Sequence, residues 1–541
     1  MNKEKTLAIY DILGIQDFIF STNKLRENLG GSIIVQNVFE KELRDLLENN
    51  GNRSLLKIKD DKIDIDNYDS ILVFYRGGNA LVIFDERSKA EEISKELSKS
   101  ILKNSGGLLN FFVAYETRQL SSFKKDLNDL FKNLKVKKNS FIRTFPLLGI
   151  SITKTELSGG LPAQFIEFRD FISLPSKKKR EKALRPTEYN DLLENLPKYE
   201  FPLELDDLGQ IKGQNYISVV HIDGNNMGQT IQDFLDKTID DYSKSIYRMS
   251  LLSAKIDNLY KNVMKDLIED ITRALNVPDF RKNFEIHLNK KTKKWCLPIR
   301  PIILNGDDIT FVCNGKLGIN LAELFLKKLS DSKLDVGGEI IEHSASAGVA
   351  IVKSHFPFDR AYRLAEELCR SSKIKGKIIK GNERGGFWLD FHIVQSDFTS
   401  DLNEIRNTQY NIIGLSDPDS LKDSNNQMTY QQSNLLWRPW LIVGENHPKE
   451  YYWSNLKKII QGFSSEEESW PRSKIKKFQQ TLTSSKEIND LFILTIRSRD
   501  LELPNFINDH EVFYKNSRMT PYFDAIEVMD YYYTEMEDIL K

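Results

Sequence analysis

Three aspartates stand where they could hold divalent cations for phosphoryl transfer. Asp223 follows the continuous apolar run 216–222, which is typical of a buried strand. Asp307 and Asp308 lie in the segment 305–308, between two further strand-like runs. Transfer of a nucleotide requires cations that neutralise the triphosphate, and carboxylates on rigid strands that hold those cations. The residue types therefore favour a Mg²⁺ or Mn²⁺ site, in which the three aspartates are both metal ligands and catalytic residues.

The turn that carries two of these aspartates also has a simpler interpretation. Its sequence is Asn305-Gly306-Asp307-Asp308, and Asn, Gly and Asp are ordinary turn formers. A turn alone, however, does not account for a carboxylate at the end of the preceding strand. We therefore favour a functional site, and we include Asn305 and Gly306, together with Asn226 beside Asp223, among its nucleotide-binding residues.

Two lysines follow the aspartates in the sequence. Lys373 and Lys377 lie at the end of a predicted helix, 358–371. A helix C-terminus favours lysines through its dipole, and Gly376 fits a C-cap, so capping is one explanation. Two lysines four residues apart that face a metal site are also suited to hold a triphosphate. Beside the aspartates, phosphate binding is the interpretation that we favour.

The elements that must position these residues occur twice in the chain. Each copy reads strand, helix, hairpin, helix, strand and helix, which is the β-α-β-β-α-β order of a ferredoxin-like palm. In the first copy the expected ranges are 7–12, 24–47, 71–75 with 80–84, 88–102, 109–115 and 123–134. In the second copy they are 216–222, a helical stretch to 275, 299–304 with 309–313, 317–329, 344–352 and 358–371. The sequence thus predicts an α+β protein with two palms that form an internal pseudo-dimer.

The predicted domains follow from this repeat. They are a first, non-catalytic palm (1–150), a linker region (151–214), a second, catalytic palm (215–395) and a mostly helical C-terminal domain (396–541). The basic run 177–180 is typical of a solvated linker, and the aromatic residues of 437–470 are typical of a helical core. Either group could instead contact RNA, as could the lysines of 290–294 beside Trp295.

Composition excludes several other classes of protein. Lys and Arg number 77 against 78 Asp and Glu, so the chain lacks the overall positive charge of a general polyanion binder. Its three cysteines contain no C-x-x-C, which excludes a disulfide framework and a zinc ribbon. No signal peptide and no apolar run long enough to cross a membrane is present. We expect a cytoplasmic protein without zinc and without membrane contact.

The ordered motifs resemble a known family. Asp223-Gly224-Asn225-Asn226-Met227-Gly228, Asn305-Gly306-Asp307-Asp308, the segment 346–350 and Lys373-x-x-Gly376-Lys377 resemble the catalytic palm of the large subunit of type III CRISPR effector complexes. That palm is related to GGDEF diguanylate cyclases. The segments 11–20 and 24–32 resemble the opening of the same subunit's first palm. The resemblance covers residues 5–135 and 215–395.

The resemblance implies a function in antiviral defence. It implies synthesis of cyclic oligoadenylates from ATP, with metal at Asp223 and Asp307 and with Asp308 supporting it. It also implies that Gly30, Gly31 and Ser32 of the first palm approach nucleotide across the pseudo-dimer interface, and that guide or target RNA and other effector subunits are partners. The first palm has Arg76-Gly77-Gly78-Asn79 at its turn, without a carboxylate, and should hold no catalytic metal.

Some features depart from the family pattern. Asn305 replaces the first glycine of the usual turn, and Asn225 replaces a second aspartate. The His-Asp pair of an HD nuclease and the cysteine ribbon of full-length members are absent from this sequence, which suggests a reduced relative. Two other functions stay open: a scaffold subunit that binds nucleotide and RNA without turnover, and a synthase of cyclic dinucleotides.

Overall fold

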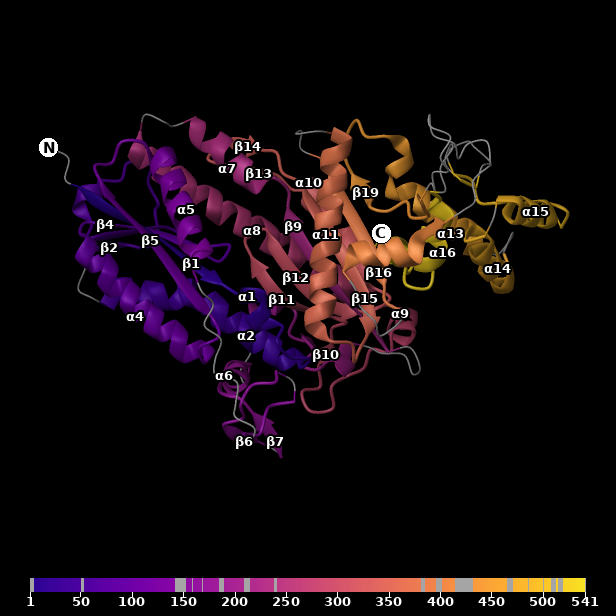
Figure 1. Ribbon diagram of the computed structural model, residues 1–541, viewed down its shortest axis with the longest axis horizontal. Coiled ribbons are helices and arrows are strands. Elements are labelled where there is room, and N and C mark those ends of the chain that lie inside the picture. Colours follow the sequence, from indigo (N-terminus) through magenta and orange to yellow (C-terminus); the bar gives the residue numbers. More distant parts are fainter. Residues whose placement is uncertain are drawn as a thin grey trace, which may run out of the picture.

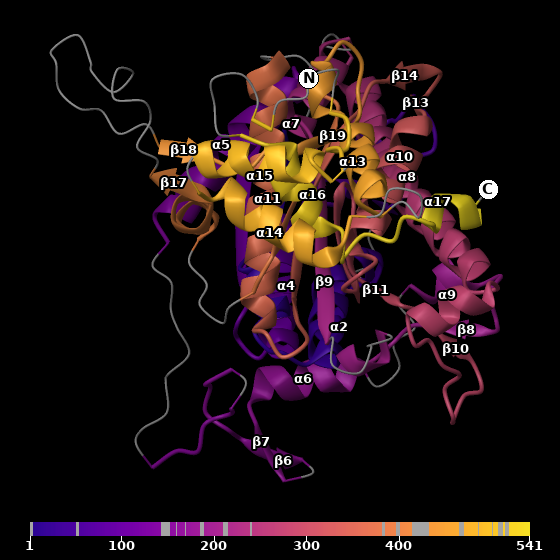
Figure 2. The same ribbon diagram turned by 90° about the vertical axis from the view of Figure 1, so that its right-hand side faces the viewer.

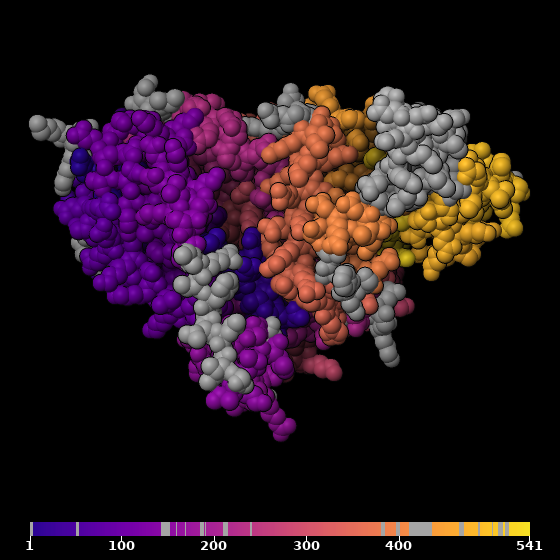
Figure 3. Space-filling view, viewed as in Figure 1, coloured from indigo at the N-terminus to yellow at the C-terminus, as the bar shows by residue number. Residues whose placement is uncertain are grey.

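The computed structural model describes most of the chain. The described ranges are 4–49, 53–141, 152–157, 159–167, 169–183, 189–208, 215–237, 241–380, 385–395, 401–413, 432–464, 470–484, 486–499, 501–506, 512–513 and 519–540. The two palms lie side by side, the first in indigo and purple and the second in magenta and orange, and the C-terminal helices lie beyond the second palm (Figure 1). The space-filling view shows the palms as adjacent lobes (Figure 3).

The first palm is built on a five-stranded sheet with the order β2-β3-β4-β1-β5. The strands are β1 (Lys5–Leu13), β2 (Ser54–Leu55), β3 (Ser70–Phe74), β4 (Asn79–Phe84) and β5 (Asn110–Arg118). Alternate residues of a strand point to opposite faces, and both faces of β1 are apolar. Ala8 and Tyr10 belong to the same core as helix α4 (Arg87–Ser105), whereas Leu7 and Ile9 pack with α5 (Phe123–Asn139). Helices therefore cover both faces of the sheet.

The second palm repeats this order in a larger sheet of six strands, β11-β12-β9-β15-β16-β19. The strands are β9 (Tyr216–Gly224), β11 (Ile299–Asn305), β12 (Asp308–Asn314), β15 (Ala345–Lys353), β16 (Phe387–Ile393) and β19 (Trp440–Val443). The helices are α7 (Met227–Asp236), α8 (Tyr242–Ala274), α10 (Gly318–Asp331) and α11 (Phe358–Lys380). The predicted β-α-β-β-α-β order of both palms is confirmed, as is the α+β class.

Two differences from the predicted elements matter for the site. Helix α11 runs to Lys380 instead of ending at 371, so Gly376 lies inside the helix and is not a C-cap. Because Gly376 has no side chain, Trp388 and Gly385 can approach the helix at this position. A Cβ on residue 376 would lie 3.0 Å from Nε1 of Trp388. In addition, the first long helix contains one π-helical turn, Val38–Leu43, between α2 (Leu25–Asn37) and α3 (Arg44–Asn49).

The region predicted as a separate C-terminal domain is joined to the second palm. Its strand β19 pairs antiparallel with β16 and forms an edge of the palm sheet. Its helices are α13 (Trp453–Ser464), α14 (Arg472–Leu482), α15 (Lys486–Arg497), α16 (Pro521–Val528) and α17 (Met536–Leu540). Trp437, Trp440, Trp453 and Trp470 are buried, so they contribute to a core. Within the described residues, no helix is long and apolar enough to cross a membrane.

The linker region packs against the first palm. Its helix α6 (Leu174–Ala183) lies along α2, and the small hairpin of β6 (Phe165–Glu167) and β7 (Asp170–Ile172) projects beside it (Figure 2). Gly30 makes this approach possible, because a Cβ there would lie 1.8 Å from the carbonyl oxygen of Lys179. The ammonium group of Lys179 is buried and donates to the carbonyl oxygen of Phe18 and, at 2.8 Å, to Oγ of Ser21. The linker therefore completes the core of the first palm.

We predict that Gly30→Ala destabilises the protein by about 2–3 kcal/mol, because the added methyl group must displace a backbone carbonyl. Urea unfolding measures this change. Gly228→Ala is the matched control, since its Cβ has no neighbour within 4 Å in helix α7 and the free energy of unfolding should stay the same or rise. Equal stability of the two variants would contradict this account of the α2–α6 contact.

Candidate nucleotide and metal site

A pocket of about 290 Å³ lies where strand β9 ends. It is bounded by the β11–β12 turn, helix α11 and the start of β16. Five of the predicted site residues meet in it: Asp223, Asn226, Asp307, Lys373 and Lys377. The remaining lining residues are Gly224, Asn225, Met227, Ser346, Gly376, Gly385 and Trp388.

Two carboxylates share the floor of this pocket. Gly224 brings them together, because a Cβ at this position would lie 2.6 Å from Oδ2 of Asp307. Burial, and then the negative charge of Asp223, raise the pKa of Asp307 to about 6. Two carboxylates that are this close repel each other when both are ionised, so a bound cation would stabilise the pair.

A lysine ammonium group places a positive charge beside these carboxylates. Nζ of Lys373 forms an ion pair with Oδ2 of Asp223 and donates to the carbonyl oxygen of Gly224 at 2.8 Å. Lys377, one helical turn further along α11, is exposed at the rim. The helical spacing predicted for the two lysines is therefore present, but Lys373 here contacts a predicted metal ligand. That it holds a triphosphate stays a prediction.

Asp308 lies beside the pocket and does not line it. The last paired residues of β12 and β9 are Ile309 and Ile222, so Asp308 faces Asp223 across the two strands. Its Oδ1 atom is buried without a hydrogen-bond partner, 3.5 Å from Nδ1 of His221. Burial and the neighbouring aspartates raise the pKa of Asp308 well above its ordinary value. Burial also lowers the pKa of His221 to about 4, so this histidine is neutral at pH 7 and supplies no charge to Asp308.

The donor set fits a hard cation that keeps ligands from its substrate. In the part of the chain that the structure describes, no three His, Cys, Asp or Glu side chains converge into a complete metal cage. Magnesium is commonly held by one or two carboxylates together with substrate phosphates and water. Asp223 and Asp307, with the raised pKa of Asp307 and the orphaned oxygen of Asp308, fit such a site.

The first palm contains a reduced counterpart of this arrangement. Asp11 faces Asn79 across β1 and β4, as Asp223 faces Asp308 in the second palm. Lys138 forms an ion pair with Asp11, and it lies as far along α5 from Phe123 as Lys373 lies along α11 from Phe358. The turn of the first palm has Gly78 and Asn79 in place of the two aspartates. The pseudo-dimer thus has one Asp–Lys pair in each half, and turn carboxylates in the second half alone.

Comparison with known proteins identifies the second half. Residues 216–379 match the family model described as Cas10/Cmr2, second palm domain. This segment is a Cas10-like palm. The predicted resemblance is confirmed for it, and the matched range contains Asp223, Asp307, Asp308, Lys373 and Lys377.

Solved structures with a related arrangement are Csm1–Csm4 cassettes. One in complex with cA4 is 15% identical with a TM-score of 0.42, over 73% of this chain and 55% of that chain. One in complex with AMPPNP is 16% identical with a TM-score of 0.43, over 69% and 54%. One in complex with pppApApA is 12% identical with a TM-score of 0.48, over 98% and 69%. The chain spans about half of the length of the first two. No curated protein matches it.

Asn225 is a site residue of the Cas10-like palm whose role the sequence did not reveal. Its side chain donates to Oγ of Ser344 and to the carbonyl oxygen of Gly386, each at 3.2 Å, and accepts from Oγ of Ser346 at 3.0 Å. It therefore ties the end of β9 to the start of β15 and to the segment before β16. The sequence offered one signal, the replacement of a family aspartate by an amide, because an amide both donates and accepts whereas an ionised aspartate only accepts.

Several predicted nucleotide contacts lie outside the pocket. Gly30 and Gly31 are buried where α2 meets Lys179 and Ile19, and Ser32 donates to the carbonyl oxygen of Ile302 in β11. These three residues contact protein, because their small side chains leave room for α6 and β11. That they approach nucleotide stays a prediction.

The turn that carries Asp307 contacts the first palm. Positive φ occurs at Gly306 (φ 66°), and the side chain of Asn305 accepts from the backbone N–H of Gly77 at 3.0 Å. Neither residue lines the pocket.

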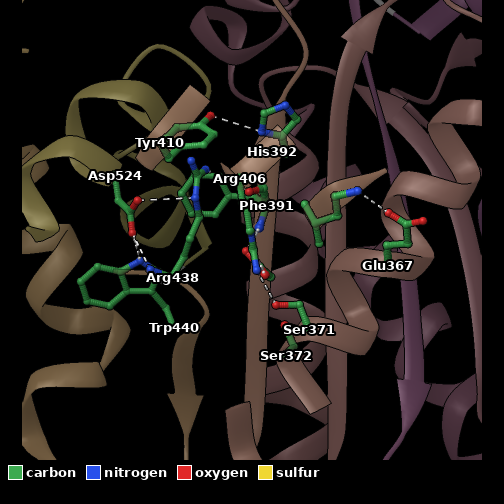
Figure 4. Close-up of polar contacts among 12 residues, drawn as sticks. Glu367, Ser371, Ser372, Phe391, His392, Arg406, Tyr410, Arg438, Trp440 and Asp524 are labelled. Atoms are coloured by element: carbon green, nitrogen blue, oxygen red, sulfur yellow. Dashed lines mark hydrogen bonds and ion pairs between the residues drawn. The ribbon is translucent and has the colours of Figure 1, made fainter. Parts of the chain in front are cut away.

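Residues of the C-terminal region contact helix α11 and strand β16 (Figure 4). Arg406 pairs with the buried Asp390 of β16 and donates to Oγ of Ser371 on α11 at 2.8 Å. The next residue, Ser372, donates to the carbonyl oxygen of Ala347 in β15 at 3.1 Å. The turn of α11 that carries Lys373 is therefore fixed on two sides.

We predict that Asn225→Asp lowers the free energy of unfolding by about 1–3 kcal/mol, because two donors are lost and a charge is placed beside Asp223. Chemical denaturation at pH 7 measures the change. The exposed Asn128→Asp on α5 serves as control and should change stability by less than about 0.5 kcal/mol. If the two substitutions cost the same, Asn225 does not tie the strand ends together.

Proposed function

We propose that the Cas10-like palm is a metal-dependent nucleotidyltransferase that joins ATP into cyclic oligoadenylates. One observation carries the proposal: Asp223, Asp307, Lys373 and Lys377 surround a single pocket within the segment that the family model matches. Carboxylates and lysines around one pocket suit a metal-bound triphosphate better than they suit any uncharged ligand. The product class follows from the family and is part of the proposal.

Each residue has a defined part in the proposed reaction. Asp223 and Asp307 are ligands of the divalent cation, and Asp308 beside them supports the metal. When bound, the cation neutralises the triphosphate and orients its α-phosphate. Lys373 leaves Asp223 for the phosphates and Lys377 adds a second contact at the rim. The ion pair of Lys373 with Asp223 is then replaced by two kinds of contact: the lysines bind phosphate oxygens, and the aspartates bind the cation.

The chemical step needs positioning more than acid–base catalysis. A ribose 3′-hydroxyl oxygen attacks the α-phosphorus of a second ATP, the bond from that phosphorus to the bridging oxygen breaks, and pyrophosphate leaves. The hydroxyl proton passes to solvent. His221 is a poor general base, because it is buried and its Nδ1 lies 3.2 Å from Oγ1 of Thr310.

The choice of nucleotide and of partners is likewise proposed. The Csm1–Csm4 cassettes named above were solved with cA4, AMPPNP and pppApApA, so ATP is the nucleotide to test first. We propose that the first palm is non-catalytic and that the chain acts with other CRISPR effector subunits and guide or target RNA. A cyclic dinucleotide is the alternative product.

A second candidate is a nucleotide-binding scaffold subunit without turnover. The observation that favours it is the ion pair of Lys373 with Asp223, because this pair occupies a carboxylate that a cation would need. The two candidates differ in turnover, because a scaffold binds nucleotide without converting it to product.

We predict that the purified protein converts ATP with Mg²⁺ or Mn²⁺ to cyclic oligoadenylates, and that Asp307→Ala/Asp308→Ala lowers the rate at least about 100-fold, because the charges that position the cation are lost. Chromatography with mass spectrometry identifies the products, and each other ribonucleoside triphosphate is tested in parallel. Chelation of the divalent cation should stop the reaction.

The same samples separate the two candidates. Asp270→Ala, which removes a carboxylate at the far end of α8, should retain full rate. Nucleotide binding without product, with and without added RNA, would contradict the enzyme and favour the scaffold. A product that persists in the double variant would show that the proposed carboxylates do not carry the reaction.

A further inference from the structure

The turn of the first palm touches the turn of the second. The backbone N–H of Gly77 donates to Oδ1 of Asn305 at 3.0 Å, so the metal-free turn 76–79 lies against the turn that carries Asp307 and Asp308. The two turns come from equivalent hairpins of the internal repeat. Their contact places a residue of the inactive half next to the catalytic residues of the other half.

A buried aspartate of helix α8 strengthens this contact. Asp257 is 3% exposed, and its Oδ1 accepts from the backbone N–H of Gly306 at 3.2 Å. Its Oδ2 forms ion pairs with Nε of Arg76 at 3.0 Å and with Nζ of Lys261 at 3.1 Å. One oxygen of this carboxylate thus accepts from the backbone of the catalytic turn, and the other oxygen pairs with the side chains of Arg76 and Lys261.

Arg76 is itself held in a fixed direction. Its guanidinium lies 4.2 Å from the centre of the Tyr75 ring and pairs with Glu40 at 3.4 Å. Glu40 lies in the π-helical turn of the first palm, and it also accepts from Gln36 at 2.9 Å. Stacking and a second carboxylate leave the guanidinium little freedom, so it presents Nε to Asp257 as a pre-positioned donor.

We propose that Arg76 and Asp257 are positioning residues for the catalytic turn of the second palm. This inference rests on the proposed function and adds a role for the first palm within it. The positive charge of Arg76, in the first palm, orients the carboxylate of Asp257. Asp257 in turn accepts from the backbone N–H of Gly306, and this hydrogen bond fixes the residue that precedes Asp307. The first palm therefore contributes to the site through its turn, without binding a metal there.

The geometry of the turn explains why such support is needed. Gly306 is a glycine at positive φ in a two-residue loop, and no side chain of its own can restrain it. A small tilt of this loop would move the carboxylate of Asp307 relative to Asp223. Metal sites depend on such outer contacts, whose loss commonly lowers affinity or activity about 10- to 100-fold.

The test compares Arg76→Ala, Arg76→Lys and Asp257→Asn with the wild-type chain. For Arg76→Ala and Asp257→Asn we expect kcat for ATP conversion to fall about 10- to 100-fold, KM for ATP to change less than about 3-fold, and half-saturation to need more Mn²⁺. Arg76→Lys keeps the positive charge and should recover part of the rate. Lys124→Ala is the control, since it removes an ion pair between the palms, with Asp236, that does not touch the turn.

A second readout does not depend on catalysis. Amide hydrogen exchange of the peptide that contains Gly306, measured by mass spectrometry on the whole folded chain, should become faster in Asp257→Asn and in Arg76→Ala and stay unchanged in Lys124→Ala. Thermal unfolding of each variant confirms that it is folded.

The outcomes separate this inference from the proposed function. If the wild-type chain makes no product, faster exchange in the two variants still supports the positioning role. If the wild-type chain makes product and the variants keep their rate, Mn²⁺ dependence and exchange, the inference is overturned and the proposed function stands. Loss of rate with equal loss in Lys124→Ala would also overturn it, because any palm–palm contact would then have the same effect.

Discussion

The approach of two carboxylates at the end of one strand is the constraint on which the rest of the structure depends. Asp223 and Asp307 line one pocket, their approach depends on a glycine at 224, and their charges must be balanced. Lys373 pairs with Asp223, and the surrounding sheet keeps the end of β9 in place through Asn225. The site is thus assembled under electrostatic strain that a metal-bound nucleotide would relieve.

The same balance of charge differs between the two halves. Both palms keep an aspartate at the end of the first strand and a lysine at the same position of the last helix. In the first palm the lysine neutralises the aspartate, because Gly78 and Asn79 add no further negative charge. In the second palm the turn adds two carboxylates that one lysine cannot neutralise. The difference in charge between the two halves at this position therefore lies in two residues of a turn.

Much of this could be predicted from the sequence, because it depends on local patterns. Apolar runs and turn residues gave the order of both palms, and the position of Asp223 after a strand placed it near Asp307. What the sequence did not give depends on contacts between distant segments. The contact of Gly30 and Gly31 with Lys179 is one example, because nothing in their motif indicates a residue that lies so far along the chain. Asp257 was missed for the same reason, since nothing in a long amphipathic helix marks one aspartate as the partner of a distant turn.

The packing of helix α6 along the first palm has a consequence for how this chain could change during evolution. Because the backbone of Lys179 fills the space above Gly30, the first palm is completed by residues that follow it, and its natural boundary is not the end of its last helix. A recombination event that exchanged the first palm at residue 150 would leave a hole in it. The first palm and helix α6 are therefore expected to be exchanged together, as one unit.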